Sequence, residues 1–337
     1  MNTLTDIKMI LIKNDSKQYN ITNYCGVINR SDNIDNLGMQ LSFEVAKNRT
    51  DKYMIGYDNV ELGDKVVFFN NDIEVFRGII VDLTTSKFVK NVTALDYAFY
   101  LNQSKTIKQF NNVIATKAIK DICNKFGVQI GNITNISTQI NKIYNNKTIA
   151  NIIKDIILQA TNELGIEYRL EMRAGKLYIE PYKNLVVKGF YKPATNLGGF
   201  DITKAIGSDI SKQESLKDRK NSVIVSSENE KSTRILATAK DDESISNVGL
   251  LQEVVSVDNK NESKAKNIAN NKLKLLNKNP EDISLSMMGD DNIRAGRIIN
   301  IEEKNTQLSG NYLIKNCRHT YINNNHKVNV NLKSVVI

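Results

Sequence analysis

Short stretches in which apolar and polar residues alternate fill the first 100 residues. Residues 41–45 (LSFEV) alternate in this way, and residues 9–12 (MILI) and 92–95 (VTAL) are further mainly apolar stretches. Clusters of Asn, Asp and Gly separate these stretches at short intervals, which is typical of turns between β-strands. The pattern predicts a small β-barrel or β-sandwich in the N-terminal part of the chain.

The clearest hairpin signal lies at residues 63–83, GDKVVFFNNDIEVFRGIIVDL. Two runs of β-branched and aromatic residues flank Asn70, Asn71 and Asp72, which tolerate the positive φ that a tight turn needs. The segment offers no obvious nucleophile, no metal ligands and no phosphate-binding glycine loop. Its expected role is therefore structural.

The hydrophobic period changes to that of a helix after residue 113. In residues 114–126 the apolar side chains share one helical face, and Gly127 is placed to end the helix in the left-handed conformation. A second amphipathic helix is expected to begin after the N-cap Thr148 and to end at Gly165.

A further hairpin is predicted from residues 166–170 and 176–180, with its turn at residues 173–175. Together with the two helices, it indicates a small α+β domain over residues 105–190. The N-terminal barrel would then occupy residues 1–104.

The rest of the chain, residues 191–337, returns mainly to strand patterns, after a loop-like segment in which Gly198 and Gly199 predict a turn or hinge. The sequence predicts strands at residues 222–225 and 250–257 and one amphipathic helix near residues 263–278. Pro280 marks the end of this helix.

The hairpin predicted at residues 63–83 has a counterpart near the C-terminus, at residues 295–321, AGRIINIEEKNTQLSGNYLIKNCRHTY. Gly63 and Gly78 are 15 positions apart, and Gly296 and Gly310 are 14 apart; a further strand pattern follows each pair. Glycine-bounded hairpins are common, so two of them need not be homologous. The alternative is an internal duplication of one β-module, split by the helical domain.

Several segments, in this order, resemble a known family. They are GDKVVFFNNDIEVFRGIIVDL with VTALDYAFYL, NNVIATKAIKDICNKFGV, DRKNSVIVSS, DDESISNVGLLQEVVSVD and MMGDDNIRAGRIINIEEKNTQLSGNYLIKNCRHTY. The chain resembles the baseplate hub proteins of contractile phage tails and phage-tail-like bacteriocins (tailocins), in the late-control-protein-D-like branch of defective prophages of Gram-positive bacteria. Each motif is degenerate, but the ordered set covers nearly the whole chain.

The resemblance implies an α+β, mainly β fold, with two tube-like β-barrel modules flanking the small helical α+β domain. It also implies a homotrimer that adapts a sixfold tail tube to a threefold central spike. The structural positions it indicates are Gly63, Gly78, Gly296, Gly310, Tyr312 and His319. The expected partners are the tail tube protein, the central spike protein, the tape-measure protein and other baseplate proteins, with DNA passing through the lumen without sequence-specific binding.

Composition adds limits to this interpretation. The net charge of +9 is concentrated in residues 101–190, where 13 Lys/Arg face 6 Asp/Glu, but the lysines are scattered and lack interleaved aromatic residues. This favours a solvated or partner-facing surface over nucleic-acid binding. No apolar run approaches the roughly 18 residues of a membrane span. We therefore expect no membrane insertion, and a protein that stays in the bacterial cytoplasm until it is assembled into a virion or tailocin baseplate.

Catalytic and metal sites are weakly supported by the sequence. Cys317, His319 and His326 would share one face of a hairpin if residues 323–324 form its turn, but a fourth ligand is missing. The carboxylates at residues 241–243 and 302–303 are adjacent in sequence and lack apolar, aromatic surroundings. We expect no catalytic residue, no bound metal and no cofactor.

Two alternatives involve the bacterial cell wall. One is a tail-tip cell-wall hydrolase, and the other is peptidoglycan binding by the helical domain. The absence of Trp argues against a sugar-stacking groove, whereas four tyrosines keep the binding alternative open: Tyr144, Tyr168, Tyr178 and Tyr182.

Overall fold

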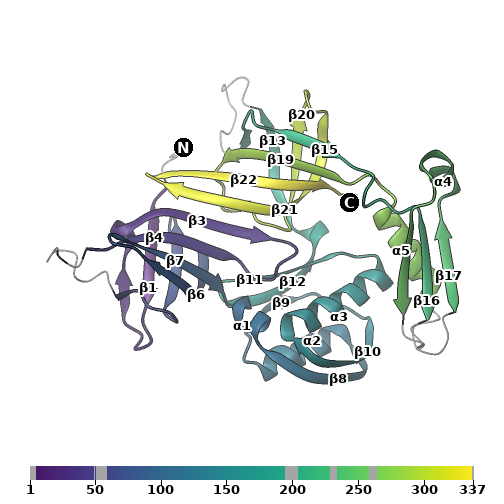
Figure 1. Cartoon of the computed structure of the whole chain (residues 1–337), viewed down its shortest axis with the longest axis horizontal. Coiled ribbons are helices and arrows are strands. Elements are labelled where there is room, and N and C mark those ends of the chain that lie inside the picture. The colour runs from purple at the N-terminus through teal and green to yellow at the C-terminus, as the bar shows by residue number, and fades with distance from the viewer. Residues whose placement is uncertain are drawn as a thin grey trace.

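A computed structural model describes residues 5–48, 50, 59–193, 204–227, 234–257 and 264–335 (Figure 1). The hinge expected at Gly198 and Gly199 lies outside these residues. Within the described ranges, no helix combines the length and hydrophobicity needed to cross a lipid bilayer. The three cysteines, Cys25, Cys123 and Cys317, are free thiols.

The C-terminal strands close into a six-stranded barrel. Each strand pairs with the next around the ring, and the last pairs with the first, so the ring has no free edge. In ring order the strands are β13 (Val186–Pro193), β14 (Ala205–Ile206), β19 (Glu281–Met288), β22 (Asn325–Ser334), β21 (Leu308–Ile322) and β20 (Ile298–Glu303). Aliphatic residues such as Ile299, Ile314 and Val330 fill its core.

The N-terminal strands form a curved sheet that continues from the barrel. Strand β3 pairs with β21 of the barrel, from Ile28 opposite Tyr321 to Asn33 opposite Asn316. Beyond β3 (Cys25–Asn33), the order is β4 (Gln40–Ala46), β7 (Val89–Asp96), β6 (Ile73–Thr85), β5 (Lys65–Asn70), β1 (Ile7–Ile12) and β2 (Gln18–Asn20), with the short 3-10 helix η1 at Thr22–Tyr24. The mainly β class is therefore confirmed, together with one closed barrel.

Both halves of this sheet use the same strand order. In the N-terminal half the order is β3-β4-β7-β6-β5, and in the C-terminal half it is β15-β19-β22-β21-β20, where β15 spans Ser211–Glu214. All of these neighbours are antiparallel. The order of the strands along the chain also agrees: it is β3, β4, β5, β6, β7 in the first set and β15, β19, β20, β21, β22 in the second, and equivalent strands occupy equivalent places in the sheet. The next strand differs, because β1 is antiparallel to β5 whereas β13 is parallel to β20.

The bases of the two hairpins are bonded alike. Gly63 and Gly296 both have positive φ, +87° and +81°. The Gly63 N–H donates to Ile80 O at 2.9 Å, and the Gly296 N–H donates to Ile314 O at 2.8 Å. Each isoleucine N–H in turn donates to the residue that follows its glycine. These positions are therefore structurally equivalent.

The second glycines of the two hairpins are not equivalent, contrary to the spacing argument. When the two hairpins are aligned on Gly63 and Gly296, Gly78 corresponds to Tyr312. Gly78 pairs with Val66, three residues after Gly63, and Tyr312 pairs with Ile299, three residues after Gly296. Gly310 lies two residues earlier, with φ +125° and no atom within 4 Å of the position that a Cβ would take. Its role is conformational, and a steric clash in the barrel wall is not the reason for a glycine there.

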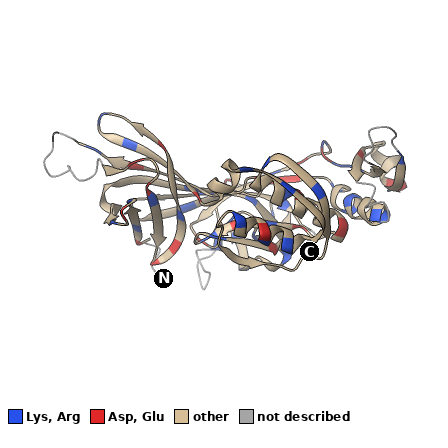
Figure 2. Ribbon diagram, turned by 90° about the horizontal axis from the view of Figure 1, so that it is seen from below, with Lys and Arg blue, Asp and Glu red and all other residues tan. Residues whose placement is uncertain are grey.

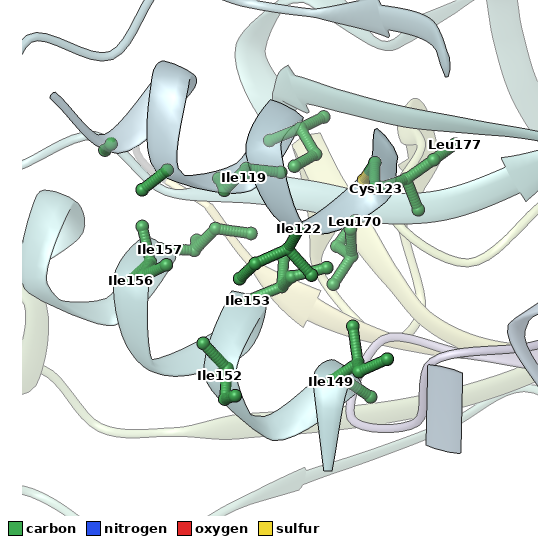
Figure 3. Close-up of a cluster of buried hydrophobic side chains, with 14 of the residues drawn as sticks. Ile119, Ile122, Cys123, Ile149, Ile152, Ile153, Ile156, Ile157, Leu170 and Leu177 are labelled. Carbon is green, nitrogen blue, oxygen red and sulfur yellow. The ribbon is translucent and has the colours of Figure 1, made fainter. Parts of the chain in front are cut away.

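The helical part forms where the sequence predicts it. Helix α2 spans Ala115–Lys125 and is followed by Gly127 at φ +66°. Helix α3 spans Ile149–Leu164, with Thr148 Oγ1 accepting from Asn151 N–H and Gly165 at φ +69°. Their facing isoleucines interdigitate in a core with Leu170 and Leu177 (Figure 3).

The remaining elements of this part enclose that core. They are α1 (Ala98–Gln103), the ribbon β8 (Lys105–Ile114) and β10 (Gln139–Thr148), and the sheet β9 (Ile130–Ile133), β12 (Lys176–Pro181) and β11 (Tyr168–Arg173), followed by the 3-10 helix η3 (Tyr182–Asn184). The sequence predicts the β11–β12 hairpin but not the β8–β10 ribbon. Strand β13 begins at Val186 and belongs to the barrel, inside the range assigned to the helical domain.

The insertion into the second β-module is larger than the single helix expected from the sequence. The predicted strands form a separate sheet, which lies to one side of the barrel in Figure 1. It contains β17 (Ile235–Lys240), β16 (Ser222–Ser227) and β18 (Gln252–Val257), with α4 (Asp242–Val248) and α5 (Ala265–Leu276). Helix α5 covers one face through Ile268 and Ala269.

We predict that Gly78→Ala destabilises the fold by about 2 kcal/mol or more. A Cβ at Gly78 would lie 2.2 Å from the carbonyl oxygen of Leu95, a backbone atom that cannot move without breaking the β6–β7 pairing. Gly63→Ala is the comparison, because it meets no atom and only strains the backbone, by about 1 kcal/mol. Urea unfolding of both variants measures the difference, and a wild-type free energy for Gly78→Ala would contradict the overlap.

Candidate functional site: a buried charged junction

The six positions singled out by the sequence do not form one site. Gly63 and Gly78 lie in the N-terminal hairpin, and Gly310 and Tyr312 lie in its C-terminal counterpart. Gly296, at the base of that counterpart, and His319 lie at the junction of the N-terminal sheet, the helical part and the barrel. At Gly296 a Cβ would lie 2.5 Å from Arg169 Cδ, so this glycine lets an arginine of the helical part approach.

Asp291 connects the barrel to the N-terminal sheet. Its carboxylate accepts from Arg30 at 2.7 Å, from Asn70 Nδ2 at 2.6 Å and from the Tyr321 hydroxyl. Arg30 is only 2% exposed and donates its other amino group to Val75 O at 3.0 Å. The loop after β19 thus places a charged group against the core of the other half of the sheet.

Arg169 connects the helical part to the same sheet. Its guanidinium donates to Asp32 Oδ1 at 2.7 Å and to the Asn33 carbonyl at 3.1 Å. Arg169 and Asp32 side chains are 2% and 4% exposed, respectively. Arg294, from the loop before β20, adds a longer ion pair to Asp32 at 3.7 Å. All three parts of the chain therefore contribute to one buried ionic cluster.

Glu171 lies two residues after Arg169 on β11 and makes more ion pairs than the other carboxylates of the cluster. Arg297 lies 2.7 Å away, Arg294 lies 3.2 Å away, and Arg173 also donates to it. Burial disfavours its charged form, but the charges of Arg294, Arg297, Arg169 and Arg173 outweigh burial and lower its pKa to about 2. Glu171 is thus ionised at any physiological pH.

The two histidines form a hydrogen-bonded pair inside this junction. The hairpin register is the predicted one, with Tyr321 opposite His326, His319 opposite Val328 and a turn at residues 323–324. His319 Nε2 donates to Ile293 O at 2.7 Å, which leaves Nδ1 to accept from His326 Nε2 at 2.8 Å. Burial lowers the pKa of His326 to about 4 and that of His319 well below its usual value.

The geometry around the histidines suits hydrogen bonding better than metal coordination. Asp291, His319 and His326 offer ligand atoms within 4.8 Å of one another. However, the 2.8 Å separation is short of the roughly 3.3 Å expected between two nitrogens on a tetrahedral zinc. The Asp291 oxygens already accept three hydrogen bonds, and Cys317 Sγ lies 3.7 Å from Ile293 O.

The carboxylates considered for hydrolysis have structural partners. Asp241 is the N-cap of α4 and accepts from Ser244 N–H at 3.0 Å. Glu303 accepts from the backbone of Asn305 and Thr306 in the β20–β21 turn. Lys and Arg residues are spread over several elements in the view of Figure 2 and do not form one continuous basic patch there.

The charged residues of the junction were not predicted from the sequence. Their signal was a charge in the buried phase of a strand pattern: Ile28, Arg30 and Asp32 alternate on the inward face of β3. Arg169 and Glu171 occupy a strand whose first five residues are all buried. From the sequence alone, such charged residues are assigned to the exposed face of a strand, because the elements that bury them are not known.

The comparisons with known proteins agree with this architecture. A protein-family model described as YQBQ-like matches residues 28–333. The chain belongs to the YqbQ-like family. The uncharacterized protein YqbQ of Bacillus subtilis (strain 168) is 24% identical over 282 residues, which are 82% of each chain. The phage-like element PBSX protein XkdQ of the same organism is 22% identical over 280 residues, 82% of this chain and 83% of XkdQ.

Solved structures share the fold over almost the full length of the chain. The tail protein from Neisseria meningitidis MC58 has a TM-score of 0.68 at 13% identity, covering 98% of this chain and 96% of its own. The 43 kDa tail protein of prophage MuSo2 from Shewanella oneidensis has a TM-score of 0.69 at 11% identity, covering 97% and 98%. Prophage tail protein gp18 from Listeria monocytogenes EGD-e has a TM-score of 0.63 at 12% identity, covering 96% and 94%.

We predict that Glu171→Gln lowers the free energy of unfolding by about 3 kcal/mol at pH 7, because it leaves buried arginines without their counter-charge. The pKa of Glu171 is lowered from 4.5 to about 2, so its stabilising charge is fully present above pH 4.5 and is lost as the pH falls toward 2. The gap between wild type and variant should therefore narrow below pH 4.5 in urea unfolding. Glu167→Gln, at a half-exposed carboxylate, is the control and should change stability by less than about 1 kcal/mol. A gap that does not depend on pH would contradict this assignment.

We also predict that neither histidine titrates near pH 6.5. Because burial lowers both pKa values, the folded protein keeps the pair neutral while the unfolded chain binds protons, so stability falls as the pH drops from about 6.5 toward 4. The chain has two histidines, so their imidazole C–H resonances are easily followed by NMR. They should stay unshifted between pH 7.5 and 5.5; a midpoint near 6.5 for either one would contradict the buried pair.

Proposed function

We propose that this chain is a structural component of a phage-type tail baseplate, acting as a hub and not as an enzyme. Three copies would form a ring that joins a sixfold tail tube to a threefold central spike. Support comes from a relative named for a phage-like element and from the fold shared with three tail proteins, two of them from prophages. The contractile or tailocin character of the particle is part of the same proposal.

The observation that carries the proposal is the repeated strand arrangement. Two sets of five strands have the same order, and their hairpins share the bonds made by Gly63 and Gly296. A chain with two like modules gives six modules per trimer, so a threefold assembly can present a nearly sixfold surface. We infer that the N-terminal sheet is the second tube-like module, completed by β21 and by neighbouring subunits.

The proposed partners follow from this position. They are two further copies of the chain, the tail tube protein, the central spike protein, the tape-measure protein and other baseplate proteins. DNA would pass through the lumen without sequence-specific contacts. The chain would be made in the bacterial cytoplasm and retained there until it enters the virion or tailocin baseplate.

Co-expression with the central spike protein of the same particle tests this function. We predict a native mass of three chains by light scattering, and a ring with six similar lobes in electron microscopy of the complex. Mass measured over a range of concentrations is the control for weak association. A strictly monomeric mass at high concentration with the spike protein present would contradict the hub.

The same preparation addresses the cell-wall hydrolase. A zymogram with peptidoglycan should show no cleared band, since Asp241 and Glu303 serve as cap and turn residues. Clearing by the purified chain would overturn the structural role.

A further inference from the structure

A cavity of about 420 Å³ lies between the helical part and the inserted unit. Its walls come from the β8–β10 ribbon and α3 on one side and from the end of β18 and the start of α5 on the other. Figure 1 shows these elements facing one another away from the barrel. A volume of this size is in the range of small-molecule sites.

Direct bonds between α3 and α5 fix the shape of this cavity. Asn271 of α5 donates to the carbonyl oxygens of Asn162 and Glu163 at 3.2 and 3.0 Å. Lys264 forms an ion pair with Glu163 at 2.8 Å. These bonds also satisfy carbonyls at the C-terminal end of α3, so the two walls are held together by the same contacts that cap the helix.

Most polar groups that line the cavity are neutral. The lysines of its wall are paired, Lys264 with Glu163 and Lys142 with Asp155 at 3.1 Å. The neutral amide and hydroxyl side chains include Gln109, Thr138, Gln139, Asn141, Gln159 and Asn162. An amide offers both donors and an acceptor, which is the set needed by a ligand rich in hydroxyl or acetamido groups.

Two buried polar atoms of this wall lack a partner in the described structure. Thr138 is only 3% exposed, and its Oγ1 makes no hydrogen bond. Asn162 Oδ1 is likewise buried without a partner. Unsatisfied buried groups are costly, and a ligand hydroxyl satisfies these two once the side chains that cover them shift slightly. Phe110 and Ile268 add apolar surface beside these atoms.

We propose that this cavity binds a neutral saccharide of one or two rings. Its alternating amide and apolar lining matches a sugar ring, which has hydroxyl groups at its rim and C–H groups on its faces. The pairing of the wall charges disfavours an anionic ligand, because both lysines among the described lining residues, Lys142 and Lys264, already neutralise a carboxylate. The site is separate from the charged junction, and the inference does not depend on the hub role.

Saturation-transfer NMR and calorimetry with the intact chain test the site. The neutral probes are D-glucose, N-acetyl-D-glucosamine and its dimer; the anionic probes are D-glucuronate and glucose 6-phosphate; and N-acetyl-triglycine amide is a neutral peptide probe. We expect binding of at least one neutral saccharide at millimolar concentration and at least tenfold weaker binding of the anionic probes.

Two substitutions locate the site. Thr138→Val keeps the volume and removes an unpaired hydroxyl, so it should leave the fold intact while weakening binding about tenfold. Asn141→Ala should weaken it by a similar factor. Asn145→Ala, an exposed position of β10 outside the cavity wall, is the matched control and should bind like wild type.

Three results would overturn the proposal. One is no transfer to any neutral saccharide, another is binding that the Thr138 and Asn141 variants leave unchanged, and the third is preference for an anionic sugar. Binding of the peptide probe alone would assign the cavity to an extended polypeptide segment and would also overturn it.

Discussion

The ion pairs between Arg169 and Asp32 and between Glu171 and its arginines hold the molecule together in one arrangement. Their side chains lie in a region that excludes water, where an unpaired charge is very unfavourable. Each part of the chain supplies only some of the charges: β3 carries the aspartate, β11 carries two arginines and a glutamate, and the loop before β20 carries two further arginines. Any displacement of one part leaves buried charges without partners.

This constraint explains why hydrophobic packing is not the main link between the parts. The helical part, the N-terminal sheet and the barrel each have their own hydrophobic core, filled mostly by residues of that part; Leu37 reaches the helical core, and Tyr321 reaches the core of the N-terminal sheet. Apolar contacts between them would tolerate sliding, whereas charged pairs require one geometry. Strand β21 adds a second fixed link, because it pairs with β20 and β22 in the barrel and with β3 beyond it. Under the proposed function, this is how one chain could keep its two modules at a set angle within a ring.

Local features were predictable from the sequence, and long-range ones were not. Thr148, Gly127 and Gly165 mark helix ends because capping depends on neighbouring residues, and the turn at residues 323–324 fixes a register that places His319 opposite Val328. The equivalence of Gly78 with Tyr312 could not be read from spacing, because the two hairpins differ in the length of their turn regions. Nor could the separate sheet of the inserted unit, since a strand pattern does not say which sheet the strand joins.

The charged junction was hidden for the same reason. Arg30 and Arg169 are 139 residues apart in sequence, and a basic residue in a strand is usually exposed. The phase of the alternation in β3 was the available clue, because it puts Arg30 and Asp32 on the face that carries Ile28.

A double-mutant cycle across the junction tests its role most directly. Asp32→Asn, Arg169→Gln and the double variant would be compared by urea unfolding at pH 7. We expect each single variant to lose about 3 kcal/mol and the double variant to lose far less than their sum, with a coupling energy of about 2 kcal/mol or more. Losses that add to within about 0.5 kcal/mol would show that the pair does not hold these parts together and would contradict the central role of the junction.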